Sequence, residues 1–541
     1  MMYDDQTNNI IGRKRLLLHV SFSAIVVIFL ALSGCQSDAI QKNTQPNIVL
    51  IMADDMGYSD LGCYGSEIET PNLDALAKNG IRFNRFYNNT RCCPTRATLL
   101  SGLYPHNAGV GKMILPAGKE GPEGPYQGYL THNAVTIAEA LKPAGYHSYL
   151  SGKWHVGEAA ENWPLTRGFE RYFGLISGAS SYFELLKNPE RQRVMALDNQ
   201  SWEPPAEGFY MTDAITDRAI EWIDTHHKQY SAPFFLYVAY TAPHWPLHAM
   251  SEDIAKYQGK YDVGWDSLRV QRYSNLKSLG LINENTLLSK RPEEIPAWAD
   301  VEDKAEWARR MEVYAAMLDR MDQGIGRIIE TLKEQGDFDN TLIIFLSDNG
   351  ASDENVEKRG LNDPSIPIGL KGSYAAYRAP WANLSNTPYR YFKKSIHEGG
   401  IASPLIAHWP SRIKAKNAIV DQLGSVADFH PTFLEIAGVD YPTTFNEYTI
   451  KPTDGISLLS ALETQKPILR QPLFWEHGGN RAIRDKDWKL VAHSWGDWEL
   501  YNLKEDGSET KDLIRQYPEI ADSLLQLYSV WAEKVGVRAH N

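Results

Sequence analysis

The chain has 541 residues, of which 43% are hydrophobic and 23% are charged, and its formal net charge is −12 at pH 7. This composition excludes a disordered or repeat protein, and the length favours a large core with a smaller appended domain. Nucleic-acid binding requires a surplus of Lys and Arg that neutralises phosphates, so the acidic balance argues against a nucleic-acid partner. An anionic substrate would need a local basic pocket.

The first 35 residues have the pattern of an export signal. Three basic residues, 13–15, precede an apolar run over residues 16–32, which ends in Ser33-Gly34-Cys35. The small residues before Cys35 resemble the bacterial lipobox, which implies cleavage before Cys35 and a lipid on its thiol. We therefore expect residues 1–35 to be a lipoprotein signal peptide and residues 36–45 a linker. The alternatives are a plain signal peptide and an N-terminal anchor helix.

A lipid on Cys35 would tether the protein to a membrane, in the periplasm or at the cell surface. Residue 36 is Gln rather than Asp, which in Gram-negative lipoproteins would favour the outer membrane.

Two apolar runs predict buried parallel strands that end in polar residues. The run Pro46–Ala53 ends at Asp54-Asp55, and the run Leu342–Leu346 follows a predicted helix over residues 305–335 and ends at Asp348-Asn349. In open α/β sheets the ligand crevice lies outside the carboxyl ends of the strands. We therefore expect these polar side chains to converge and to form a metal site.

The remaining pattern predicts an α/β fold with a large, mostly parallel sheet and a smaller C-terminal domain. Predicted strands at 146–150, 233–240 and 404–408 alternate with predicted helices at 72–78, 135–141, 213–225 and 424–437. Beyond Leu462, short aromatic strands at 472–476, 481–484 and 488–492 precede a helix at 518–534. The predicted domains are residues 46–462, a catalytic domain, and residues 463–541, an antiparallel sheet with one helix. Residues 251–300 form an insertion without an assigned element.

The segment Cys92-Cys93-Pro94-Thr95-Arg96 carries the strongest chemical signal. Pro94 and Gly102 bracket a predicted helix, which places Cys92 just before a helix N-terminus, where anions bind. If Cys35 carries lipid, Cys63, Cys92 and Cys93 remain, and this odd number leaves one cysteine unpaired or modified. From the adjacent cysteines alone, a structural disulfide is the alternative, and whether Cys63 pairs with Cys93 stays open.

The wider motif, Cys-x-Pro-[Ser/Thr]-Arg followed by Leu-Ser-Gly, resembles the signature of type I sulfatases of the alkaline phosphatase-like superfamily. In that family the cysteine becomes formylglycine (3-oxoalanine), and the register selects Cys92. Thr95 stands where many members have Ser. The resemblance runs from Pro46 to beyond Trp488, with further motifs in family order at 54–55, 152–155, 242–244, 347–350, and Lys393 before 398–400.

The resemblance implies a metal bound by Asp54, Asp55, Asp348, Asn349 and the modified Cys92. Three carboxylates and an amide oxygen suit a hard dication, Ca²⁺ better than Mg²⁺. For any one aspartate pair alone, helix capping would be the alternative.

The resemblance also implies catalytic roles for five further residues. Arg96 and Lys153 would hold the formylglycine and the sulfate, and Lys393 would contact a sulfate oxygen. His155 would assist proton removal from the second hydroxyl of the hydrated aldehyde, and His244 would protonate the leaving oxygen. The first hydroxyl attacks sulfur in the family mechanism, which gives a covalent sulfate intermediate.

The sequence therefore predicts a hydrolase of sulfate monoesters, with a sulfated carbohydrate or an aryl sulfate as substrate and a formylglycine-generating maturation enzyme that acts before export. Rival functions are a phosphodiesterase or phosphonate monoester hydrolase of the same superfamily, an inactive glycan-binding lipoprotein, and a thiol hydrolase that uses Cys92 and His155 directly. His397 and residues 476–481 are candidates for substrate contacts, or are ordinary loop residues.

Overall fold

The computed structural model describes residues 45–187, 192–494 and 496–538. The predicted signal peptide, Cys35 and nearly all of the predicted linker lie outside the described residues. Within these three ranges, no helix is long and apolar enough to cross a membrane.

The core of the described chain is one 11-stranded mixed sheet. The path β10-β2-β9-β8-β1-β7-β3-β4-β5-β6 runs across it, and β11 pairs with β2. The five strands from β8 to β4 are parallel, whereas β9 runs antiparallel to both of its neighbours. The strands are β1 (Asn47–Ala53), β2 (Ile81–Tyr87), β3 (His147–Gly152), β4 (Arg171–Leu175), β5 (Met195–Leu197), β6 (Gln200–Ser201), β7 (Phe234–Ala239), β8 (Thr341–Ser347), β9 (Ala402–His408), β10 (Ala418–Val420) and β11 (Gly424–Ser425).

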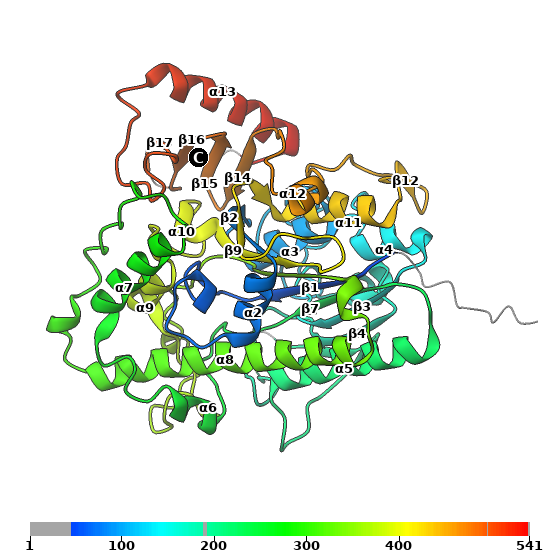
Figure 1. The fold of residues 1–541 in the computed structure, drawn as a ribbon, viewed down its shortest axis with the longest axis horizontal. Coiled ribbons are helices and arrows are strands. Elements are labelled where there is room, and N and C mark those ends of the chain that lie inside the picture. The colour runs from blue at the N-terminus through cyan, green and yellow to red at the C-terminus, as the bar shows by residue number, and fades with distance from the viewer. Residues whose placement is uncertain (1–44, 188–191, 495, 539–541) are drawn as a thin grey trace, which may run out of the picture. The chain divides into compact units, whose positions relative to one another are not determined.

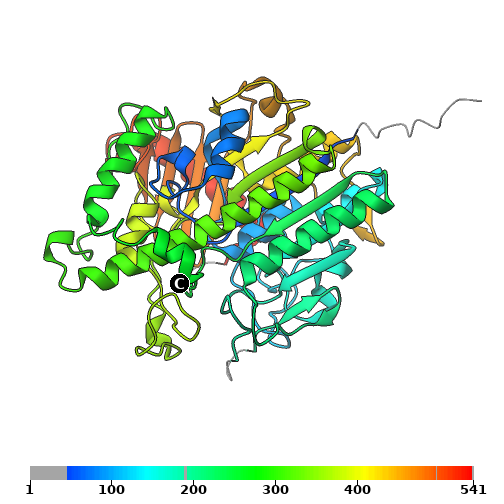
Figure 2. The same ribbon diagram turned by 60° about the horizontal axis from the view of Figure 1, so that its bottom comes forward.

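Helices cover both faces of this sheet, because the central strands are apolar on both sides. In β1, Val49 and Ile51 enter one core, and Ile48 and Leu50 enter the other. The helices α2 (Pro71–Asn79), α5 (Met211–Gln229) and α8 (Lys304–Glu334) lie over the first core. The helices α3 (Cys92–Ser101), α4 (Ile137–Leu141), α11 (Phe429–Ala437) and α12 (Leu459–Thr464) lie over the second (Figure 1). Figure 2 shows α5 and α8 side by side along their face.

The register of the parallel strands brings the two acidic strand ends together. Ala53 pairs with Ser347, and Met52 pairs with Ala239 of β7. Just beyond the strands, the Asp348 N–H donates to the Ala53 carbonyl at 3.1 Å. The convergence that the apolar runs predicted is therefore confirmed.

A small antiparallel sheet with one helix follows, as predicted. Its strands are β14 (Leu473–His477), β15 (Asn480–Asp485), β16 (Trp488–Ala492) and β17 (Glu499–Asn502), and α13 (Pro518–Val535) packs against it. Phe474 and Trp531 stack with ring centroids 5.1 Å apart. A two-stranded ribbon, β12 (Thr444–Phe445) with β13 (Tyr448–Thr449), precedes this sheet.

Two predicted elements differ from the structure. Residues 424–437 are not one helix: Gly424–Ser425 pairs with β2, and α11 begins only at Phe429. The reason is a capping box, in which the Asp428 carboxylate accepts from the Ser425 N–H at 2.8 Å and the Ser425 hydroxyl caps the following turn. The helix α3 begins at Cys92 itself rather than after it.

The unassigned insertion contains α6 (Ser251–Lys256) and α7 (Gly264–Ser278). The helix α7 packs against α9 (Arg378–Ser385), which precedes the short helix α10 (Glu398–Ile401).

Candidate active site

The predicted metal ligands meet at the carboxyl edge of the large sheet. Ligand atoms of three of them, Asp54, Asp55 and Cys92, lie within 4.8 Å of one another and of a ring nitrogen of His244, which was predicted to be catalytic. All four side chains are buried. The Asn349 Nδ2 donates to Asp55 Oδ1 at 2.7 Å. The Asp55 N–H donates to an oxygen of Asp348 at 3.2 Å. Residues separated by nearly three hundred positions thus form one compact acidic cluster, as predicted.

Three buried cations are paired with the three carboxylates of this cluster. The Lys153 Nζ lies 2.6 Å from Asp54 Oδ2, and the Lys393 Nζ lies 2.6 Å from Asp55 Oδ1. The Arg96 Nη2 lies 2.9 Å from Asp348 Oδ2. Because three positive charges face three negative ones, the protein side chains of the site are balanced in charge.

Two oxygens of the cluster have no hydrogen-bond donor. Asp54 Oδ1 and Asn349 Oδ1 are buried, and the described residues offer neither of them a partner. An unsatisfied buried acceptor costs about 1–3 kcal/mol. Burial, together with Asp348, raises the pKa of Asp54 to about 7, although Lys153 and Arg96 oppose this shift. Both observations describe buried oxygens that lack an electrostatic partner, which a hard divalent cation at these oxygens would supply.

Cys92 lies at the first position of α3, and all ten residues of this helix are buried. Gly102 ends the helix in the left-handed conformation, with φ 70°. The backbone N–H groups of the first turn face the start of the helix, which favours an anion there. Burial raises the pKa of the Cys92 thiol to about 12. Without a bound metal ion, burial thus disfavours the thiolate form of the unmodified side chain.

The two predicted catalytic histidines differ in their surroundings. His155 lies beside Cys93, with its Nε2 3.4 Å from the Cys93 Sγ. The His244 Nδ1 donates to the Trp245 carbonyl at 2.6 Å, and its Nε2 lies 3.5 Å from Asp55 Oδ2. Burial lowers the pKa of His244 to about 3, although Asp55 opposes this shift. The resting imidazole of His244 is therefore neutral, with its proton on Nδ1.

Other cysteine and substrate-contact candidates form internal contacts. Among the described residues Cys63 has no disulfide partner, and it belongs to the core on the face of the sheet opposite to that of Cys93. His397 is fully buried, and its Nε2 lies 3.0 Å from Glu499 Oε2. Glu476 is also buried, with Oε2 2.8 Å from the Nε2 of His106.

Sequence reasoning missed the series of polar contacts that runs from His244 through Trp245 and Glu354 to Lys394. The Trp245 Nε1 donates to Glu354 Oε2 at 2.8 Å, and the Lys394 Nζ lies 2.8 Å from Glu354 Oε1. The available signal was their position, because each lies within a few residues of a predicted site residue.

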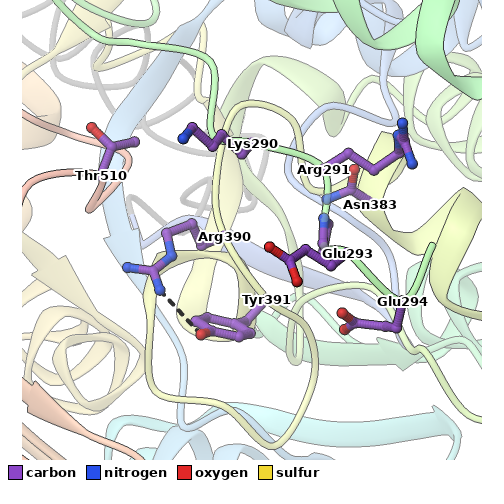
Figure 3. A pocket seen from close by; sticks show the side chains of 9 residues that line it. Lys290, Arg291, Glu293, Glu294, Asn383, Arg390, Tyr391 and Thr510 are labelled. Carbon is purple, nitrogen blue, oxygen red and sulfur yellow. Dashed lines mark hydrogen bonds between the residues drawn. The ribbon is translucent and has the colours of Figure 1, made fainter. Parts of the chain in front are cut away.

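A further cavity of about 540 Å³ lies between the insertion and the loop before α10 (Figure 3). In it, the Arg390 Nη2 donates to the hydroxyl of Tyr391 at 3.0 Å. None of the predicted catalytic or metal-binding residues lines this cavity.

Comparison with known families and proteins agrees with this geometry. The family model described as Sulfatase matches residues 46–439, and the model described as N-sulphoglucosamine sulphohydrolase, C-terminal, matches residues 388–529. The chain is 35% identical to an uncharacterized sulfatase of Schizosaccharomyces pombe, over 92% of this chain and 95% of that protein. It is 36% identical to the arylsulfatase of Klebsiella aerogenes, over 79% of this chain and 93% of that protein.

Solved structures show the same fold. The crystal structure of Ps i-CgsB in complex with k-i-k-neocarrahexaose is similar with a TM-score of 0.67 and 27% identity, and the match covers 90% of this chain and 93% of that chain. The phosphonate monoester hydrolase of Agrobacterium radiobacter shares the fold with a TM-score of 0.54 and 21% identity, over 90% of this chain and 96% of that chain.

The large mixed sheet, the acidic cluster at its carboxyl edge and the appended antiparallel sheet together define an alkaline phosphatase-like hydrolase. Within that class, the chain belongs to the sulfatase family, whose model matches most of its length.

Metal binding gives a first test. We expect Ca²⁺ to raise the thermal unfolding temperature, because a ligand present at about 100 times its Kd stabilises the folded state by about 2.7 kcal/mol. The substitution Asp54→Asn removes one charge from the cluster and should abolish most of this shift. The exposed Asp440 serves as control, because Asp440→Asn should leave the shift unchanged. An equal Ca²⁺-induced shift in all three proteins, measured by differential scanning calorimetry, would contradict a metal site at Asp54.

Proposed function

We propose that this protein hydrolyses sulfate monoesters of carbohydrates, with a formylglycine formed from Cys92 as nucleophile and Ca²⁺ as metal. The observation that carries the proposal is the position of Cys92. It lies at the N-terminus of α3, within 4.8 Å of ligand atoms of Asp54, Asp55 and His244. Membership of the sulfatase family supports the same reaction.

The charge of the site suits a sulfate ester. The three carboxylates and the three buried cations cancel, so a divalent cation would leave an excess of two positive charges for a singly charged ester. Asp54, Asp55, Asp348, Asn349 and residue 92 would hold this cation. When bound, Ca²⁺ would withdraw electron density from the ester oxygens and stabilise negative charge that develops on them.

The buried cations would orient the reacting groups. A formylglycine at position 92, as its hydrate, supplies one hydroxyl that attacks sulfur and a second whose deprotonation permits release of sulfate. Lys153 and Arg96 approach the cluster on the side of Asp54 and Asp348, and Lys393 approaches on the side of Asp55. Their charges would hold the sulfate oxygens. His155, next to Cys93, would accept the proton of the second hydroxyl.

His244 would donate a proton to the leaving oxygen. Its Nδ1 proton is held by the Trp245 carbonyl, so Nε2 is the nitrogen that gains and loses a proton. A bound sulfate ester offsets part of the positive charge beside the imidazole and so makes its protonated form less unfavourable. The Nε2 proton then passes to the leaving oxygen as the sulfur–oxygen bond breaks.

Two relatives support the substrate class. The crystallised complex of Ps i-CgsB contains an oligosaccharide, which favours a sulfated carbohydrate. The arylsulfatase relative supports the proposal that small aryl sulfates are substrates as well. The phosphonate monoester hydrolase shares only the fold, so the phosphodiesterase or phosphonate alternative has weaker support. A kcat/KM for 4-nitrophenyl phosphate or phenylphosphonate that exceeds the value for 4-nitrophenyl sulfate would favour that alternative.

The adjacent cysteines give a direct test of the nucleophile. Cys92→Ala removes the formylglycine precursor, and we expect complete loss of sulfate release from 4-nitrophenyl sulfate. Cys93→Ala is the matched control, because Cys93 is equally buried but lies beside His155 instead of in the acidic cluster. It should retain most of the activity. If both variants lost activity equally while their circular dichroism spectra stayed unchanged, the assignment of the nucleophile to Cys92 would be wrong.

We further propose that the protein is an exported lipoprotein, anchored to a membrane through lipid on Cys35, and that a maturation enzyme modifies Cys92 before export. The support is the basic and apolar pattern of residues 13–32 followed by Ser33-Gly34-Cys35. In a bacterial host, Cys35→Ser should prevent incorporation of a labelled fatty acid and move the protein from the membrane fraction to the soluble fraction. Incorporation of label by the Cys35→Ser variant would exclude this anchor.

A further inference from the structure

Glu354 connects three segments that form the active site. It lies five residues after Asn349, and only 11% of its side chain is exposed. One carboxylate oxygen accepts the indole N–H of Trp245 at 2.8 Å. The other lies 2.8 Å from the Nζ of Lys394 and 3.8 Å from Nη2 of Arg359. Glu354 thus joins the segments that follow β8 and β7 to the loop that carries Lys393.

Trp245 transmits this contact to His244. The rings of the two residues are 4.3 Å apart between centroids. The Trp245 carbonyl accepts the Nδ1 proton of His244, while its indole nitrogen is bonded to Glu354. The Arg359 guanidinium lies 4.4 Å from the centroid of the indole ring and adds a cation–π contact. Both polar groups of Trp245 near the site are therefore engaged, one with His244 and one with Glu354.

Lysine side chains keep Glu354 ionised. Burial would raise the pKa of the Glu354 carboxyl, but Lys393 and Lys394 lower it well below its ordinary range. A charged acceptor makes a stronger hydrogen bond to the indole N–H than a neutral one. The backbone of Lys394 is in turn held by its N–H, which donates to the Thr90 carbonyl at 3.1 Å. Lys394 thus fixes the carboxylate of Glu354, which accepts the indole N–H of Trp245, next to the loop that carries Lys393.

We propose that Glu354 is a positioning residue for leaving-group protonation, because through the indole of Trp245 it holds the His244 ring with Nε2 directed toward the reacting centre. The inference rests on the proposed function, in which His244 is the proton donor. Neither Glu354 nor Trp245 needs to touch the sulfate. Their contribution is to the orientation of one imidazole.

Positioning of His244 predicts a kinetic effect that a purely structural role of Glu354 would not cause. Proton donation matters most when the leaving oxygen is strongly basic, and it matters little for a stable leaving group such as 4-nitrophenolate. A misdirected His244 should therefore slow poor leaving groups selectively. Loss of a metal ligand or partial unfolding would slow every substrate by a similar factor.

The test measures kcat/KM of the mature, full-length enzyme on a series of substituted phenyl sulfates. Trp245→Phe keeps an aromatic ring beside His244 but removes the N–H that Glu354 accepts, and Glu354→Ala removes the acceptor. We expect each variant to lose about 10-fold to 100-fold on phenyl sulfate and less than about 3-fold on 4-nitrophenyl sulfate. Trp298→Phe is the matched control, since its indole N–H donates to Asp262 in the insertion, and it should not change the dependence on the leaving group.

A double-mutant cycle with His244→Ala completes the test. If Trp245 acts through His244, then Trp245→Phe should cause no further loss on phenyl sulfate in the His244→Ala background. Equal losses across the series, no loss at all, or losses that add to that of His244→Ala would overturn the proposal. Mass spectrometry of each variant separates these outcomes from incomplete formylglycine formation. Failure of the proposed function itself would be distinct, because Cys92→Ala would then retain sulfate release.

Discussion

The crowding of three buried carboxylates against three buried cations is the constraint on which the site depends. Asp54, Asp55 and Asp348 are nearly inaccessible to water, and at such short separations like charges repel strongly in a medium of low polarity. Lys153, Arg96 and Lys393 compensate this repulsion but leave two oxygens without donors. The oxygens without donors therefore suit a dication, and the buried cations suit an anionic ester.

Backbone geometry makes this crowding possible. The parallel register of β1 and β8 delivers the two acidic ends to one edge, and Asp55 itself has a left-handed backbone with φ 69°. Glycines allow the closest approaches. A Cβ on Gly350 would lie 1.8 Å from the Gly399 carbonyl oxygen, and one on Gly178 would lie 2.4 Å from the His155 Nε2. Either side chain would displace a segment that carries the site.

The sequence predicts the parts of the site that depend on local pattern. The apolar runs before Asp54 and Asp348 identify two strands, and the rule for strand ends predicts that their acidic residues converge. The sequence does not predict which distant side chains contact each other. Trp245 and Glu354 are 109 residues apart and leave no periodic signal. The strand β2 is also hard to recognise, because Arg82, Asn84 and Arg85 interrupt its apolar pattern.

The reaction proposed for this site requires that residue 92 of the mature protein is formylglycine. Trypsin cleaves after Arg91 and after Arg96 and so releases the peptide of residues 92–96. Its mass, measured on enzyme with confirmed sulfatase activity, should show loss of the sulfur of Cys92 and gain of a carbonyl, with the thiol of Cys93 intact. An unmodified thiol at position 92 in fully active enzyme would exclude formylglycine as the nucleophile.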